Sequence, residues 1–363
     1  MGMILVPMAG LDLLFTISLI IAMRYISGCL IFCFLSLSIY SQMPAAGDAN
    51  KTVSFNKKII ADQLDDPWTV VYGPGNKLWI TESRGYRVLR LNPETGDRDT
   101  LADLNSLRNF PRYDTINDET DGGKPWPQGG LMGMALHPAI LKGKAFVYLA
   151  YVFDFEGKHD SGKGENRTDG GFHFLTRIVR YVYDTVAQKL VDPVTICDSI
   201  PGSNDHNGGR LIISDLEGKP YLFYSVGDMG AGQFANGGRQ NFAQLHDRYE
   251  GKILRFETEP LDNATPAGSW IPKDNPFKGN KYPIWSLGHR NGQGLAKLIV
   301  QGKTKLYLAE HGPFSDDEIN VIVKGGNYGH PLVIGYADGN YNGLAAGVTP
   351  TDSLPGKWNT TYP

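Results

Sequence analysis

The chain has 363 residues with Gly 44, Pro 22, 20% charged residues and a formal net charge of -3. This length is enough for a large core, and the glycine and proline content favours many short strands joined by tight turns over a helical protein. The small net charge and the lack of a basic run give no reason to expect nucleic acid as a partner.

Residues 4–41 are almost wholly apolar, with charges mainly at Asp12 and Arg24. A short positive start followed by an apolar run is typical of a signal peptide, with Arg24 supplying the charge and Ser41 preceding the cleavage site. In this interpretation translation starts at Met23. The pattern predicts an exported protein, periplasmic or secreted.

A membrane anchor over residues 4–22 is the alternative, since about 20 apolar residues can span a bilayer. Both interpretations treat residues 1–41 as a targeting segment and residues 42–363 as the folded domain. Contact with a membrane is expected only through this N-terminal segment.

The folded domain contains a single cysteine, Cys197, because Cys29 and Cys33 lie in the targeting segment. No internal disulfide is therefore possible. The surrounding residues 194–197 are typical of a strand, which predicts a buried, unreactive thiol.

Three kinds of short apolar segment recur in the same order along the domain. The first segments of the four groups are 68–72, 131–136, 210–213 and 295–300. The second segments end in a polar residue and are 77–82, 145–151, 220–228 and 305–310. The third segments alternate apolar with polar residues and are 87–91, 177–181, 252–256 and 318–322.

Groups of three or four strands repeated without amphipathic helices are typical of the blades of a β-propeller. The sequence therefore predicts an all-β propeller, with a β-sandwich as the alternative. Two long polar segments, 109–128 and 156–174, enlarge the spacing between groups and favour functional loops. The second segments end at Asp228, Glu310 and their counterparts, so we expect the site at these strand ends.

Two segments carry candidate chemistry. In 203–210, Asp205 and His206 stand side by side in a glycine-rich loop, and a histidine beside a carboxylate can act as a base near neutral pH. In 285–295, Arg290 lies between glycines that leave room for a ligand. Alone, each segment is common on protein surfaces.

The acidic segment 310–320 is followed by the glycine-rich segment 324–329. Acidic side chains and free carbonyls at a turn suit calcium, which takes six to eight oxygen ligands, but a solvated turn is the simpler interpretation.

The order in which these motifs occur together is more specific for one protein family than any single motif. Gln-Gly-Gly-Leu-Met-Gly at 128–133, Asp-His at 205–206, Gly-His-Arg-Asn-x-Gln-Gly-Leu at 288–295 and the segments 310–320 and 324–329 stand in one order. In this order they closely resemble the soluble quinoprotein glucose/sorbosone dehydrogenase family, over roughly residues 60–340.

The resemblance implies a six-bladed propeller, of which about four blades are present here, so the domain 42–363 is expected to be incomplete. It implies oxidation of an aldose at the anomeric carbon to the lactone, with pyrroloquinoline quinone (PQQ) as the cofactor that accepts hydride. His206 is then the base with Asp205 beside it, and Arg290 stabilises charge on the quinone.

Further site residues follow from the same resemblance. Asn291 and Gln233 match positions that contact the cofactor, and Gln128, Asp205 and Gln233 match positions at the sugar. Calcium, the second cofactor, matches these positions: Gly312, Pro313, Glu318, Tyr328, Tyr336 and Asp338. One departure is His311, where the family has glutamine.

The partners implied are a small sugar and an electron acceptor that the sequence does not identify, and a homodimer stays open. Two other functions also stay open: a propeller that binds carbohydrate or a partner without catalysis, and a calcium-dependent propeller lactonase. Joint retention of Asp205, His206 and Arg290 argues against a mere scaffold.

Overall fold

The computed structural model describes residues 55–108, 128–155, 171–233, 236, 238–261, 268–277, 283–312 and 317–332. The chain divides into two compact units, Met1–Lys58 and Ile59–Pro363. Within the described ranges, no helix is long and apolar enough to cross a bilayer. The predicted targeting segment 1–41 lies outside them, so its role stays a prediction.

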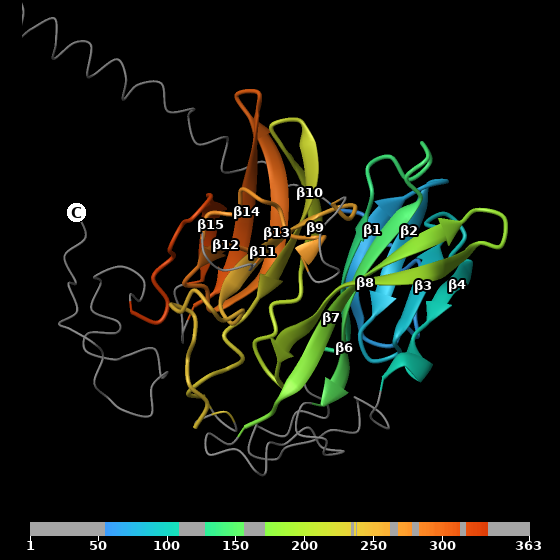
Figure 1. Cartoon of the computed structure of the whole chain (residues 1–363). Helices are drawn as coiled ribbons and strands as arrows, with labels where there is room; N and C mark the ends of the chain where they lie inside the picture. Colours follow the sequence, from blue (N-terminus) through green and yellow to red (C-terminus); the bar gives the residue numbers. More distant parts are fainter. Residues whose placement is uncertain are drawn as a thin grey trace, which may run out of the picture. The chain divides into compact units, whose positions relative to one another are not determined.

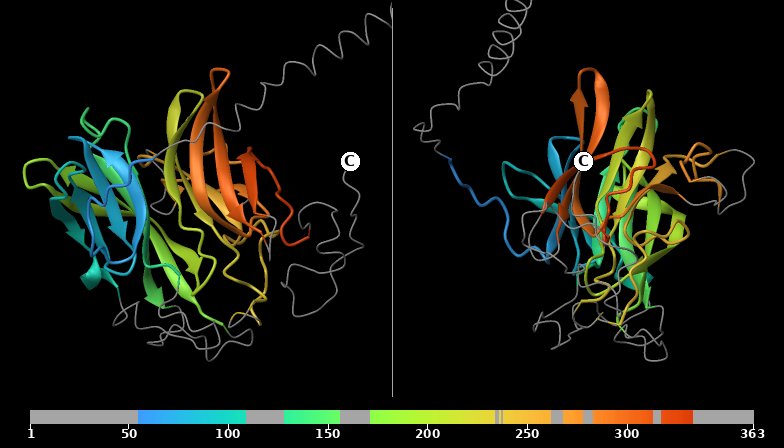
Figure 2. Two further views of the ribbon diagram at one scale, coloured as in Figure 1. Left: turned by 180° about the vertical axis from the view of Figure 1, so that it is seen from behind. Right: turned by 90° about the vertical axis from the view of Figure 1, so that its left-hand side faces the viewer.

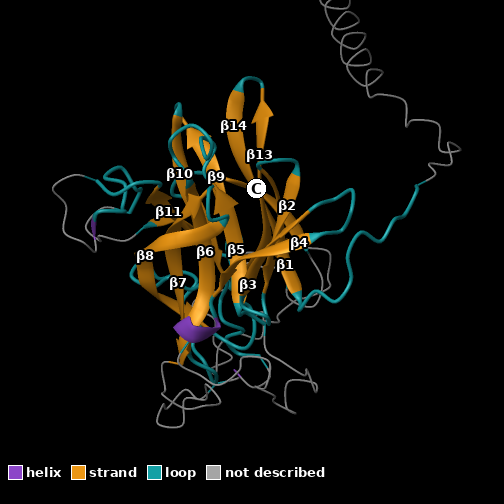
Figure 3. Cartoon of the chain, turned by 90° about the vertical axis from the view of Figure 1, so that its right-hand side faces the viewer, coloured by secondary structure: helices purple, strands orange, loops and turns teal. Residues whose placement is uncertain are grey.

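The second unit is built from antiparallel strands arranged in four sheets (Figure 1). Figure 3 shows that strands and loops make up nearly all of the described chain, and the short 3₁₀ turn η1 spans Asn105–Leu107. The strands of the first sheet are β1 Pro67–Gly73, β2 Lys77–Glu82, β3 Arg87–Leu91 and β4 Arg98–Asp103. Those of the second are β5 Leu131–Leu136, β6 Phe146–Phe155, β7 Phe174–Asp184 and β8 Lys189–Gly202.

The third sheet has the same up-and-down order as the first two. Its strands are β9 Leu211–Leu216, β10 Lys219–Val226, β11 Lys252–Glu257 and β12 Ile284–Leu287. The fourth sheet comprises β13 Asn291–Val300, β14 Lys303–His311 and β15 Glu318–Ile322. In every sheet each strand pairs with its neighbour in the sequence, as in the blades of a propeller.

Side chains of successive strand residues point to opposite faces of a sheet, and this alternation joins each sheet to the next. On β6, Leu149 and Tyr151 pack into the cluster shared with the first sheet, whereas Tyr148 and Ala150 pack into the cluster shared with the third. On β10, Phe223 turns to the opposite side and packs against the fourth sheet. The four sheets therefore stack face to face in chain order, which the colour sequence in Figure 2 follows.

The first strand of each sheet contacts the first strand of the neighbouring sheet: β1 contacts β5, β5 contacts β9, and β9 contacts β13. Because neighbouring strands run antiparallel, the start of each first strand and the end of each second strand lie at the same edge. Loops at this edge can converge, which is the arrangement that the sequence predicted for the site.

The predicted all-β propeller is confirmed, with four blade-like sheets in the described part of the chain. The expectation of further blades stays a prediction. Cys197 lies on β8 as predicted, but it is only partly buried. Burial raises the pKa of its thiol, which agrees with the predicted lack of reactivity.

Candidate functional site

Asp205 and His206 lie in the loop that leads into β9, and both side chains are buried. His206 has a φ of 50°, in the left-handed region that residues other than glycine rarely adopt. Its carbonyl accepts a hydrogen bond from the amide of Met229 at 3.3 Å. Gln128 reaches the same loop, since its Oε1 accepts from the His206 amide at 3.3 Å.

The carboxylate of Asp228, two residues beyond β10, is the main partner of His206. The Nδ1 atom of His206 lies 2.7 Å from Oδ1 of Asp228, whereas its Nε2 lies 3.8 Å from Oδ2 of Asp205. Asp228 therefore holds the imidazole, and Asp205, which the sequence pointed to, is the more distant carboxylate.

Asp228 is fully enclosed and accepts four hydrogen bonds or ion pairs. Oδ1 takes Nδ1 of His206 and the amide of Gly230, and Oδ2 takes Nε2 of His330 at 2.8 Å and Nδ2 of Asn241 at 3.2 Å. Burial opposes ionisation of this carboxyl, but His206 and His330 outweigh burial and hold its pKa well below the usual range. Asp228 is therefore ionised at neutral pH and can only accept, so Nδ1 of His206 carries a proton and Nε2 is left as the basic atom.

Arg290 enters the site from the connection between β12 and β13. Its guanidinium donates to the carbonyl of His311 from Nη1 at 3.2 Å and to Oε1 of Gln233 from Nη2 at 3.2 Å. Its Nε is buried and has no hydrogen-bond partner in the described chain. A buried donor without a partner costs free energy, so this atom suits an anionic or carbonyl-bearing ligand.

A buried network behind Arg290 fixes its backbone. Glu310 accepts from the amide of Arg290 through Oε1, and its Oε2 lies 2.9 Å from Nδ1 of His289. The Nε2 atom of His289 in turn lies 2.9 Å from Oγ of Ser286. Burial opposes ionisation of Glu310, but His289 and the Arg290 amide outweigh it and hold the pKa of this carboxyl below its usual range. The carboxylate therefore anchors Arg290 from the neighbouring strand.

The departure at His311 changes little in this arrangement. The His311 side chain is largely exposed and lies 3.5 Å from the Asp317 carboxylate, while its backbone carbonyl is the group that meets Arg290. A backbone contact does not depend on the side chain at that position.

The two halves of the site meet through the backbone. The amide of Asp228 donates to the carbonyl of Arg290 at 2.7 Å, and Oδ1 of Asn291 accepts from the amide of Gly208 at 3.1 Å. His206, Asp228 and Arg290 are thus brought together from three connecting segments, as expected for loops at one edge of the sheets.

The metal positions are less complete. Pro313, Tyr336 and Asp338 lie outside the described residues. The Tyr328 hydroxyl donates to the carbonyl of Val321 at 2.6 Å and accepts from Val323, and Glu318 is exposed at the start of β15. Over the described ranges there is no group of three or more His, Cys, Asp or Glu side chains that could hold a metal ion. The calcium positions, Gly312 included, stay a prediction.

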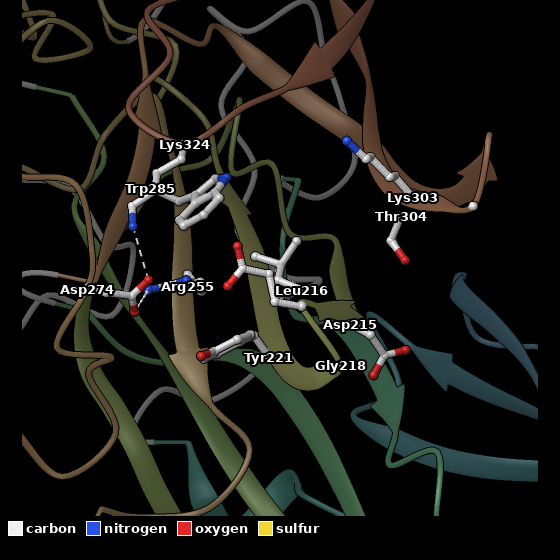
Figure 4. A pocket seen from close by; sticks show the side chains of 12 residues that line it. Asp215, Leu216, Gly218, Tyr221, Arg255, Asp274, Trp285, Lys303, Thr304 and Lys324 are labelled. Atoms are coloured by element: carbon white, nitrogen blue, oxygen red, sulfur yellow. Dashed lines mark hydrogen bonds and ion pairs between the residues drawn. The ribbon is translucent and has the colours of Figure 1, made fainter.

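A pocket of about 720 Å³ opens elsewhere, at the far ends of the strands (Figure 4). It lies between the β9–β10 turn at Glu217 and the β13–β14 turn at Gly302. On one wall the guanidinium carbon of Arg255 lies 4.5 Å from the ring centroid of Tyr221 and 4.4 Å from that of Trp285. None of the predicted site residues lines this pocket, and its turns lie opposite the strand ends that carry Asp228 and Arg290.

The close approach of Gly227 to His206 gives a testable prediction. A Cβ atom at Gly227 would lie 1.9 Å from the His206 carbonyl oxygen, so a Gly227→Ala substitution must displace the backbone beside Asp228. Because a shift of 1 Å in a catalytic group can cost up to about 10²-fold, we expect turnover per folded molecule to fall about 10- to 10²-fold.

Steady-state kinetics on protein whose fold is checked by circular dichroism measures this effect. Gly218→Ala is the matched control. Gly218 has a φ of 82°, so alanine there is also strained, but no atom lies within 4 Å of the added Cβ. Gly218 lies far from the site. Equal turnover in both variants would contradict the expected displacement.

The sequence and the fold of this chain are similar to those of known sugar dehydrogenases. A sequence profile described as glucose/sorbosone dehydrogenase matches residues 64–357. Quinoprotein glucose dehydrogenase B of Acinetobacter calcoaceticus is 38% identical over 300 residues, which cover 79% of this chain and 55% of that protein. The chain therefore spans about half the length of this relative.

Solved structures agree with the sequence comparison. The PQQ-bound aldose sugar dehydrogenase of Streptomyces coelicolor superposes with a TM-score of 0.53 at 26% identity, covering 76% of this chain and 65% of that one. The apo form of the soluble aldose sugar dehydrogenase of Escherichia coli gives a TM-score of 0.54 at 28% identity, covering 77% and 68%.

Proposed function

The chain belongs to the glucose/sorbosone dehydrogenase family, and from this premise we propose that it oxidises an aldose at the anomeric carbon to the lactone, with PQQ as the electron acceptor. The observation that carries the proposal is the 2.7 Å contact between Nδ1 of His206 and Asp228. It makes Nε2 the ring nitrogen of this buried histidine that Asp228 does not hold, 3.8 Å from a second carboxylate, Asp205.

His206 acts as the general base in this proposal. Nε2 takes the proton of the anomeric hydroxyl, and the imidazolium that forms is stabilised by the ionised Asp228. Asp205 and Gln128 each accept from the His206 amide, and in this proposal their side chains hydrogen-bond the sugar and hold its hydroxyl against Nε2.

The residues around Arg290 fit an anionic quinone. The buried Nε of Arg290 has no hydrogen-bond partner among the described residues, Gln233 accepts from Nη2 of Arg290, and Asn291 follows Arg290 in the chain. When bound, PQQ supplies the group that accepts the hydride from the anomeric carbon. Arg290 then stabilises the negative charge that develops on the cofactor oxygen, an interaction that is strongest in the transition state.

Calcium is part of the proposal as a second cofactor, supported by the oxygen-rich segment 310–320. The carbonyl oxygens of Gly312 and Pro313 are the proposed ligands, with Glu318, Tyr328, Tyr336 and Asp338 as further candidates. No step of the reaction is assigned to the ion.

The location and partners of the protein are also proposed. The apolar segment 1–41 supports export, either as a cleaved signal peptide or as an anchor. Outside the cytoplasm the enzyme would pass electrons to a separate acceptor.

Titration of the purified full chain with PQQ, with and without Ca²⁺, tests the proposal. We expect a quinone absorption band that an aldose bleaches, and loss of the bleaching when a chelator removes Ca²⁺. Sugar binding without a quinone band would support a binding module instead, and lactone hydrolysis without quinone would support a lactonase.

A further inference from the structure

Lys252, the first residue of β11, is completely buried and has no part in the proposed chemistry. Its Nζ donates to the carbonyl oxygens of Phe242 at 3.0 Å, Ala243 at 2.9 Å and Glu250 at 2.6 Å. An ammonium has three N–H donors, so these three carbonyls use all of them.

Lysine is rarely buried to this degree unless its charge is compensated. Here the compensation comes from the carbonyl dipoles of one connecting segment, 241–251, which folds around the ammonium. Without the cation, these carbonyls would face one another in a buried space and lose their donor. The segment therefore depends on Lys252 for its conformation.

One end of this segment is tied to both strand ends that carry the site. The amide of Gly251 donates to the carbonyl of Gly227 at 2.8 Å, and the carbonyl of Gly251 accepts from the amide of His289 at 3.1 Å. Gly227 precedes Asp228, and His289 precedes Arg290. The residue next to Lys252 thus joins the backbones of the two groups.

The other end reaches the Asp228 carboxylate itself. Nδ2 of Asn241 donates to Oδ2 of Asp228 at 3.2 Å, and Oδ1 of Asn241 accepts from the amide of Ala243 at 2.9 Å. The carbonyl of Ala243, which Lys252 binds, also accepts from the amide of Gly288 at 3.0 Å. A shift of the segment would therefore move Asn241 away from Asp228 and release the start of 288–291.

We propose that Lys252 is a positioning residue for the reaction: its ammonium fixes the segment 241–251, which in turn fixes Asp228 relative to Arg290. As far as turnover is concerned, the proposal rests on the proposed function. It assigns a role to a group that touches neither sugar nor cofactor.

The charge state of Lys252 gives this role a distinctive pH dependence. Burial lowers the pKa of Lys252 to about 7, opposed by the carboxylates of Glu250 and Asp247 in its own segment. His289, on the β12–β13 connection, is joined to the segment through its backbone amide, and its imidazole lies against Ser286 and Glu310 instead. Above this pH the neutral amine has two donors for three carbonyls, so the segment loses one contact.

As the pH rises above about 7, turnover should then fall while the free energy of unfolding rises. An unfolded lysine stays protonated to about pH 10.4, so between about 7 and 10.4 the unfolded state binds more protons than the folded state. From this group alone, the free energy of unfolding rises with pH in that window. Turnover falls in the same window, because the ammonium form is the one that holds the segment.

Hydrogen exchange of the full chain, with and without the Lys252→Met substitution, tests the proposal. In the variant we expect amide exchange to accelerate about ten-fold or more in peptides 226–232, 241–251 and 286–293, while peptides of the first sheet keep their parental rates. Turnover should fall about ten-fold, and its decline above pH 7 should disappear. Lys303→Met, at the exposed start of β14, is the control and should match the parent.

The outcomes separate the two proposals. Parental exchange in all three peptides overturns the role of Lys252 whatever the activity, whereas a parent without PQQ-dependent turnover overturns only the proposed function. If Lys252→Met does not fold, Lys252→Gln, which keeps a polar side chain but lacks the ammonium, is compared with the parent in the same way. The three peptides should then lose protection relative to the first sheet, and unchanged relative protection would overturn the role.

Discussion

Replacement of His206 by alanine is expected to lower sugar oxidation by about 10²- to 10⁴-fold, the usual contribution of a general base. The variant loses the Nε2 atom that takes the proton, whereas Arg290, Gln233 and Asn291 keep their contacts with one another and with the backbone. PQQ binding should therefore persist. Stopped-flow reduction of the bound quinone by an aldose measures the step directly.

His137→Ala is the matched control, because His137 follows the end of β5 and its ring packs against Phe146 at a centroid distance of 6.0 Å, outside the site. It should reduce the quinone at the parental rate. If His206→Ala also did so, His206 would have no part in proton transfer, and Asp205 would become the alternative base.

Substitution of Arg290 by methionine should lower kcat by about 10²- to 10³-fold, as expected when a donor to a developing negative charge is removed. Methionine keeps most of the buried volume but removes the guanidinium that meets Gln233 and the His311 carbonyl. Because the proposed function assigns sugar binding to residues near His206, the KM for the sugar should change much less than kcat.

The same kinetics on Arg98→Met provide the control, since the Arg98 side chain is exposed and donates to the carbonyl of Asp62 in the first sheet. If the Arg290→Met variant had an unchanged kcat and a raised KM, Arg290 would contribute to sugar binding and would not stabilise charge on the cofactor.

The strands that could be predicted are those with a short apolar run or a clear alternation. The segments 77–82 and 131–136 are apolar runs that coincide with β2 and β5, and the segments 87–91 and 318–322 alternate apolar with polar residues and coincide with β3 and β15. Two of the fourth strands, β4 and β12, were missed. β4 is mostly exposed and β12 has only four residues, so neither carries a clear alternation.

The site was predicted in part. The motifs identified His206, Arg290, Gln128, Gln233 and Asn291, and the structure brings them together. The sequence pointed to Asp205 as the carboxylate beside His206, because the two residues are adjacent. The structure places Asp228 closer to the imidazole. Asp228 could have been recognised from its position, because it ends the second segment of its group, at the edge where loops converge.

Other site groups could not be found from spacing. His330 and Asn241 reach Asp228 from segments 102 and 13 residues away along the chain, and neither belongs to a recurring motif. Lys252 resembles any lysine that begins a strand, and its burial is set by the fold of the segment around it. Such contacts depend on the tertiary arrangement alone.

The separation between the site edge and the opposite hairpin turns has a practical consequence for attaching the protein to a solid support. At Gly218 and Gly302 an added side chain would meet no atom within 4 Å. A cysteine introduced at either turn would offer a reactive handle far more accessible than Cys197, at the cost of a positive φ. Immobilised through that handle, every molecule would present the edge with the candidate site away from the surface, toward the solution.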